Sequence, residues 1–152
     1  MRAIVFAALT LAACAAPGRP ATGQAPTQSN AAAPLALQIR ADMARLDREL
    51  RASGVVAAGI GQPADLGDGL LIRPLAVIED SRCPNNARCV WAGRLRLSAN
   101  VSGEDLELTL GQPTLTAHGS VLLAVASPGP WTDWPTHELG AKPGYRFGFR
   151  RA

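Results

Sequence analysis

Two cysteines in the middle of the chain have the types and spacing that most clearly allow chemistry. Cys83 and Cys89 enclose Pro84 and the turn-prone pair Asn85-Asn86, so the chain can reverse and bring the two sulfurs within bonding distance. We therefore expect a disulfide. In the chain-entropy account, closing so short a loop adds only about 2 kcal/mol, so the bridge should hold local shape more than global stability.

Charged and aromatic residues border this pair of cysteines. Asp80 and Arg82 flank Ser81 just before Cys83, and Trp91 follows Cys89 by two positions. The two charges could form a polar recognition patch, but a charge-paired loop that orients the chain is the more ordinary use of such residues. Trp91 could stack on a ligand, and we expect instead that it packs over the disulfide.

A second aromatic segment lies near the C-terminus. Trp131 and Trp134 stand three positions apart in a proline-bracketed stretch that also holds His137. The two indoles could bind a sugar or a peptide, although tryptophans at this spacing more often cap the edge of a core. His137 could transfer protons with Asp133 or Glu138, but no nucleophile motif or paired-carboxylate constellation accompanies it. We therefore expect no enzymatic activity.

Metal binding is not expected either. Cys83 and Cys89 are further apart than the usual zinc knuckle allows, and His118 and His137 are distant from each other in the sequence. An oxidising compartment would favour the disulfide over a metal site. The sequence thus indicates no metal and no cofactor.

Short alternating segments must position these residues. Between residues 54 and 152 the hydrophobic pattern has the period of strands, with turn residues between them. The expected strands span residues 55–60, 70–80, 94–101, 106–110, 121–125 and 145–150. Pro74 lacks an amide hydrogen, so the second strand should lie on an edge or form a bulge there. The pattern predicts a mainly β domain, an antiparallel sandwich or a small barrel.

An amphipathic helix is predicted before the strands, over residues 35–51 within a segment 35–53. Its apolar positions recur at steps of three and four, and charged residues fill its other faces. Asp47 and Arg51 stand in the favourable order for an ion pair one turn apart. We expect the helix to cover the β domain; a short coiled coil or a partner-binding helix is the alternative.

The N-terminus is typical of an export signal, because Arg2 precedes an apolar stretch that ends in small residues. Residues 11–14, Leu-Ala-Ala-Cys, match a bacterial lipobox, which predicts a signal peptide over residues 1–13 and a lipid on Cys14. An ordinary cut after Ala13 or Ala16 is the alternative. Residues 14–34 are rich in Ala, Pro, Gly and Gln, which predicts a disordered tether of about 25 Å mean length. In such lipoprotein signals the residue after the cysteine directs sorting between the two membranes. Ala15, rather than Asp, at this position indicates the outer membrane.

The motif around the cysteines carries a resemblance. Asp-Ser-Arg-Cys-Pro at residues 80–84, followed by Cys-Val-Trp-Ala-Gly at 89–93, resembles the signature of a family of small, uncharacterised bacterial envelope lipoproteins. Gly61-Gln62, Ser127-Pro128 and the terminal Gly144-Tyr145-Arg146-Phe147 also lie where that family's pattern has them. The resemblance covers roughly residues 54–150, leaves out the helix, and brings no established activity.

Composition and these motifs together predict a class of function. The chain has 152 residues, 47% of them hydrophobic, enough for one domain with one core. Lys and Arg number 15 against 12 acidic residues, an excess too small and too dispersed to favour a nucleic-acid partner. We expect a lipid-anchored, periplasm-facing structural or binding module with a protein or glycan partner. The alternatives are an envelope hydrolase with an unrecognised site and an inhibitor or chaperone-like factor using residues 131–137.

Overall fold

The computed structural model describes residues 33–152. Its elements are one long helix, eight strands and a short helix: α1 (Leu35–Leu50), β1 (Val56–Gly59), β2 (Ala64–Asp65), β3 (Leu71–Asp80), β4 (Leu95–Val101), β5 (Glu104–Thr109), β6 (Pro113–Thr116), β7 (Gly119–Ser127), α2 (Thr136–Leu139) and β8 (Arg146–Arg151). The predicted signal peptide at 1–13, the lipid site at Cys14 and nearly all of the tether at 14–34 lie outside the described residues.

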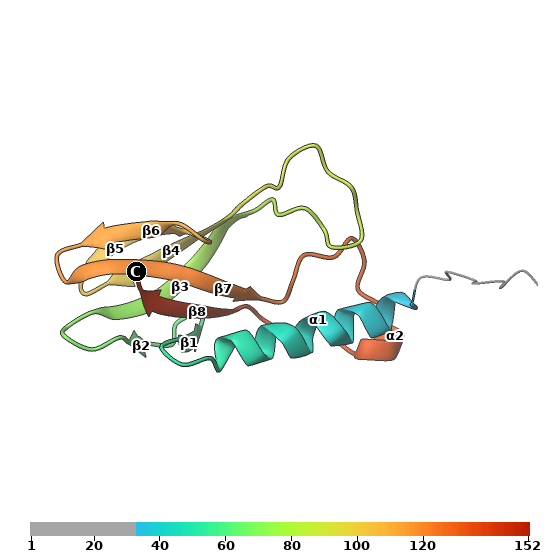
Figure 1. Cartoon of the computed structure of the whole chain (residues 1–152), viewed down its shortest axis with the longest axis horizontal. Helices are drawn as coiled ribbons and strands as arrows, with labels where there is room; N and C mark the ends of the chain where they lie inside the picture. The colour runs from blue at the N-terminus through green and yellow to red at the C-terminus, as the bar shows by residue number, and fades with distance from the viewer. Residues whose placement is uncertain (1–32) are drawn as a thin grey trace, which may run out of the picture. The chain divides into compact units, whose positions relative to one another are not determined.

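The strands form two antiparallel sheets of four strands each. The strand order is β1-β8-β7-β6 in one sheet and β2-β3-β4-β5 in the other. The sheets lie face to face as a sandwich and do not close into a barrel, so the first of the two predicted architectures is confirmed (Figure 1). Between them lies a core of aliphatic side chains around Phe147 and Phe149 of β8, both fully buried.

Strand β4 shows how the alternating pattern produces this core. Its residues alternate between buried and half-buried along the whole strand, with Leu95, Leu97, Ala99 and Val101 turned inward. The hairpin to β5 closes through Ser102 and Gly103, which both have positive φ. Positive φ at both central residues matches the right-handed twist of the paired strands.

Helix α1 covers the outer face of the sheet that contains β7 and β8. Leu46 and Leu50 pack against Val125 of β7, as expected for an amphipathic helix on a β domain. Gly148 permits this approach, because a Cβ atom there would lie 2.8 Å from Val55 and 3.2 Å from Leu50. The first half of α1 extends past the sheet toward α2 (Figure 1).

Two register shifts bend β3. They lie between Pro74 and Ala76 and between Val77 and Glu79 in the pairing with β4. Both alternatives for Pro74 are therefore realised. A bulge follows it in the pairing with β4. Strand β2, on the other side of β3, pairs only with residues 71 and 72, so β3 is an edge strand on that side at Pro74. Each bulge adds an outward residue, so Leu75 and Ile78 are exposed.

Three elements differ from the expectation. Strands β2 and β6 and the short helix α2 were not expected, and residues 111–113 were expected to end the hairpin, whereas Pro113 begins β6. All three elements have four residues or fewer, too few for a periodic pattern to appear. Pro113 is tolerated because β6 is an edge strand.

Candidate functional site

The candidate site residues lie at one end of the domain. We call this region the loop end and define it as residues 81–94, residues 128–145 and the first half of α1. Asp80, Arg82 and Trp131 line one pocket there, whereas Trp91 and Trp134 each line a different hollow. The structure thus brings the expected residues into one region but not into one site.

The disulfide loop projects from the sandwich, beyond the ends of β3 and β4 (Figure 1). Cys83 and Cys89 are bonded, with Cα atoms 5.9 Å apart, which confirms the expected bridge. Backbone hydrogen bonds continue the strand pairing into the stem: Ser81 N donates to Arg94 O and Cys83 N to Ala92 O, both over 2.9 Å. The loop is therefore held both covalently and by its stem.

Gly93 allows the two sides of the stem to meet. A Cβ atom at this position would lie 1.7 Å from the carbonyl oxygen of Ser81, and Gly93 has a φ of +67°. Both the contact and the backbone conformation require glycine. This explains physically why glycine ends the Cys-Val-Trp-Ala-Gly segment.

Asp80 and Arg82 form an ion pair that joins the loop to the opposite sheet. Arg82 Nε and Nη2 donate to the two carboxylate oxygens of Asp80, each over 2.7 Å, and their side chains are only 12% and 17% exposed. Arg82 also donates to the carbonyl oxygens of Ala126 and Pro128, at 3.4 and 3.1 Å. Asp80 and Arg82 therefore have the geometry of a charge-paired loop that orients the chain, which was the expected use of these two residues.

Tyr145 completes this network. Its hydroxyl donates to Asp80 Oδ2 over 2.8 Å, and its ring stacks on Phe147. Burial raises the pKa of the Asp80 carboxyl, but the hydrogen bonds from Arg82 and Tyr145 outweigh it and hold that pKa below its ordinary value. Burial, and then the bond to Asp80, raises the pKa of Tyr145. A carboxylate held ionised in this way is poorly suited to general acid catalysis.

A pocket of about 220 Å³ opens beside this network. It is lined by the residues of this network, Asp80, Arg82 and Tyr145, and by Pro130, Trp131 and Lys142. It has room for a small polar group. Its carboxylate and guanidinium already neutralise each other, and no hydroxyl or thiol nucleophile stands in its lining beside a histidine, the arrangement that acyl transfer requires.

Trp91 does not pack over the disulfide, so that expectation is wrong. Its side chain is 81% exposed, and the neighbouring Val90 is 91% exposed. None of residues 81–94 is buried, because the loop stands away from the sandwich and is too thin to enclose an indole. Trp91 instead borders a hollow of about 500 Å³ with Glu79, Ser81 and Arg94.

Glu79 anchors the base of that hollow. It accepts hydrogen bonds from the Ser81 hydroxyl at 2.8 Å and from Arg94 Nε at 2.9 Å. These two bonds, that of Ser81 foremost, lower the pKa of Glu79. Glu79 therefore remains a carboxylate near neutral pH and holds both sides of the loop stem.

Asp42 of α1 joins three segments of the loop end, a role that the sequence pattern did not indicate. Its Oδ2 accepts hydrogen bonds from Trp131 Nε1 and from Asn85 Nδ2, both over 3.1 Å, and Arg45 binds Oδ1 over 2.5 Å. The Asp42 side chain is 9% exposed. A Cβ atom on Gly129 would lie 2.1 Å from Asp42 Oδ2, so a larger residue there would displace this carboxylate from its partners.

Trp134 and His137 belong to the segment around α2. Trp134 is half-buried and donates its indole N–H to Gly140 O over 2.9 Å, while Arg40 of α1 donates to Glu138 O over 2.9 Å. Both indoles of this segment thus bind internal partners, in keeping with a capping role. His137 is exposed on α2, and His118 lies apart from it in the turn between β6 and β7.

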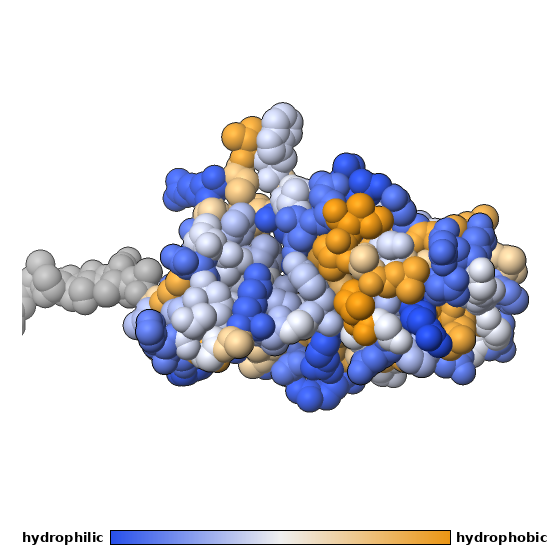
Figure 2. All heavy atoms as spheres, turned by 180° about the vertical axis from the view of Figure 1, so that it is seen from behind, coloured by the Kyte–Doolittle hydropathy of each residue, from blue (hydrophilic) through white to orange (hydrophobic). Residues whose placement is uncertain are grey.

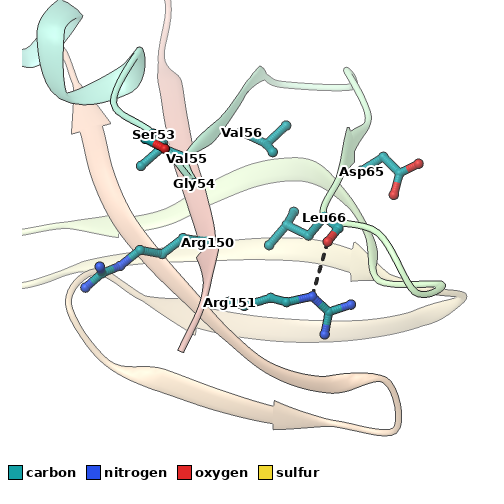
Figure 3. A pocket seen from close by; sticks show the side chains of 8 residues that line it. All are labelled: Ser53, Gly54, Val55, Val56, Asp65, Leu66, Arg150 and Arg151. Carbon is teal, nitrogen blue, oxygen red and sulfur yellow. Dashed lines mark hydrogen bonds between the residues drawn. The ribbon is translucent and has the colours of Figure 1, made fainter.

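Another hollow lies away from the loop end. It measures about 510 Å³ and is bordered by β1, β2 and the end of β8 (Figure 3). Figure 3 shows the Arg151 side chain directed to the carbonyl of Leu66, at 3.1 Å. The same guanidinium donates to the carbonyl oxygens of Gly67 and His118. Arg151 therefore closes this end of the sandwich.

Within residues 33–152, no group of three or more His, Cys, Asp or Glu side chains is placed to hold a metal ion. In the same part of the chain, no helix has both the length and the apolar character needed to cross a membrane.

The chain matches no protein-family model, no curated protein and no solved structure. The resemblance to envelope lipoproteins therefore stays a prediction from the sequence.

Proposed function

We propose that this protein is a lipid-anchored, non-catalytic binding module of the bacterial cell envelope. The proposed anchor is a lipid on Cys14, and the proposed location is the periplasmic side of the outer membrane. The loop end is the proposed binding surface. The lipobox at residues 11–14 and a disulfide suited to an oxidising compartment support the location.

One observation carries the binding role: Trp91 is 81% exposed on a loop that a disulfide and two ion pairs hold in shape. Burying an indole is favourable, and adjacent apolar side chains exposed together, as Val90 and Trp91 are, mark interaction surfaces. A loop that is already ordered loses little conformational entropy when it binds. A rigid, exposed tryptophan is the kind of residue that dominates binding interfaces.

Site-specific photocrosslinking in cells that export and lipidate the protein tests this proposal. A photoreactive phenylalanine analogue replaces Trp91 in one variant and Leu115 in a matched control, since Leu115 is also apolar and 83% exposed but lies on β6. The expected result is a reproducible adduct from position 91 and none from position 115. Equal adducts from both positions, or none from position 91, would contradict a binding role for the loop end.

Fractionation tests the anchor separately. The wild-type protein is expected in the membrane fraction, and Cys14→Ser is expected to leave it or to remain unprocessed. A wild-type protein found in the soluble fraction would remove the lipoprotein proposal while leaving the crosslinking result to be judged by itself.

A further inference from the structure

The tip of the disulfide loop carries the most exposed pair of consecutive large apolar residues in the described domain. Val90 and Trp91 are 91% and 81% exposed. Leu115 on β6 is 83% exposed but stands between two threonines, and the other exposed large apolar residues are 40 to 51% exposed. Figure 2 shows a narrow projection that stands clear of the body and carries a hydrophobic group, in orange, beside a pale one at its tip. A projection of this shape can insert into a deformable partner. The rest of the domain then needs no shape complementarity to that partner.

The positive charge of residues 81–94 indicates which kind of partner the tip would bind. Residues 81–94 contain Arg82, Arg88 and Arg94 and no acidic residue. Arg82 and Arg94 are paired with Asp80 and Glu79, but within residues 33–152 the exposed Arg88 forms no salt bridge. An apolar, aromatic tip beside a free guanidinium is complementary to the interface of a bilayer, where tryptophan is enriched and where phosphates attract arginine.

The path of the chain connects the proposed lipid to the end of the domain that carries this tip. Helix α1 begins at Leu35, and its first half lies in the loop end, where Asp42 binds Asn85 of the disulfide loop. The segment that carries the proposed lipid therefore joins the domain at the same end as the tip. The tether of about twenty residues that the sequence predicts would keep the tip at high effective concentration near the bilayer, so that even a weak contact is populated.

We propose that Val90 and Trp91 insert into the headgroup region of the bilayer that holds the lipid anchor, with Arg88 on lipid phosphates. This inference rests on the proposed lipid anchor and names the partner of the loop end. The approach is tip first, because the neighbouring segment exposes Asp133 and Glu138, which anionic headgroups would repel if the domain lay flat. The bilayer thus fixes the orientation of the domain as well as its location.

Quenching by brominated lipids tests this contact with the full-length, lipidated protein. The vesicles contain phosphatidylethanolamine and phosphatidylglycerol, with or without bromine on the acyl chains near the headgroup. The fluorescence of Trp91 is obtained as the difference between wild type and Trp91→Phe, because Trp131 and Trp134 also emit. Bromine is expected to reduce this difference by roughly half, as for an indole at the interface.

A relocated reporter supplies the matched control. In the double variant Trp91→Phe, Leu115→Trp, the new indole lies on β6 and is expected to show no bromine quenching. Arg88→Glu is expected to weaken the quenching of Trp91 in these anionic vesicles but not in vesicles of phosphatidylcholine alone. Arg73→Glu, an exposed charge reversal on β3, should leave it unchanged.

The outcomes separate the two proposals. A protein that stays with the vesicles while Trp91 is not quenched overturns the bilayer contact and leaves the anchor standing. Equal quenching at positions 91 and 115 also overturns it, because the domain would then meet the bilayer without a preferred face. A wild-type protein that does not associate with vesicles overturns both. In cells, a photoadduct of position 91 to a protein without any lipid adduct would assign the tip to a protein partner instead.

Discussion

The sandwich and the disulfide loop, residues 81–94, are held together by different forces. The sandwich is closed by apolar burial, with Phe147, Phe149, Ile72 and Leu97 all at 0% exposure. None of residues 81–94 is buried, and this loop is held instead by a disulfide, by ion pairs and by hydrogen bonds to Asp42 and Asp80. Because polar and covalent contacts hold the disulfide loop, its apolar side chains remain free to contact a partner.

The largest expected effect lies in the sandwich. Phe147→Ala should lower the free energy of unfolding by about 3 to 5 kcal/mol, because it removes a fully buried ring and leaves a cavity. Chemical denaturation measures this loss. Leu115→Ala, at an exposed position, is the control and should change stability by less than about 0.5 kcal/mol. Similar losses at both positions would mean that the sheets are not closed by this core.

The ion pair of the loop end should come next. Arg82→Ala should cost about 2 to 3 kcal/mol, because it leaves the poorly exposed Asp80 carboxylate and two backbone carbonyls without their donor. Arg88→Ala removes the same type of side chain from the same loop at an exposed site and should cost less than about 0.5 kcal/mol. If the two variants unfolded at the same denaturant concentration, the network would not stabilise the domain.

The disulfide should contribute somewhat less. The double variant Cys83→Ser, Cys89→Ser should lose about 2 kcal/mol, since the loop it closes is short. Far-UV circular dichroism should be unchanged, because the sandwich does not depend on the bridge. In the native wild type, both thiols should resist alkylation until a reductant is added. Labelling without reductant would show that the bridge is absent in solution.

Acid should weaken the loop end through Asp80. Its pKa is lower in the folded protein than the ordinary value of about 3.9, so its contribution to stability is present above about pH 4 and is lost as the pH falls through the folded pKa. Asp80→Asn should therefore cost about 1 to 2 kcal/mol at pH 7, by making charge-assisted hydrogen bonds neutral. Unfolding curves measured from pH 7 down to below pH 4 should converge for the two proteins. A constant difference over that range would mean that Asp80 does not titrate as described.

The smallest expected effect is at the tip. Trp91→Ala should change the free energy of unfolding by less than about 0.5 kcal/mol, because the indole contacts mainly water in the folded domain. Thermal or denaturant unfolding checks this. A loss above about 1 kcal/mol would restore the first expectation, that Trp91 packs on the disulfide. An unchanged free energy of unfolding would sharpen the contrast between the two regions, because the indole would then be dispensable for folding.

Some features of this protein follow from the sequence alone. The alternation of residues 94–101 and the three- and four-residue steps of residues 35–51 predict β4 and α1, because burial on one face of a strand or helix leaves a regular period. The spacing of Cys83 and Cys89 predicts their bond, because the cross-link is local. The hydrogen bond from Tyr145 to Asp80 was not predicted, although the alternation of Tyr145 with Phe147 and Phe149 is a signal that could have placed its phenol on the inward side, where a hydroxyl needs a polar partner.

Other features were decided only by the tertiary structure. Asp42 meets Asn85 and Trp131, which are 43 and 89 residues away in sequence, and no period along a chain records which loops a helix will meet. Trp91 was misjudged for a related reason: whether a large side chain is buried depends on whether another element lies within reach of it. The sequence determined which residues are apolar and what local structure they adopt, and the packing of distant segments decided which of them remain in water.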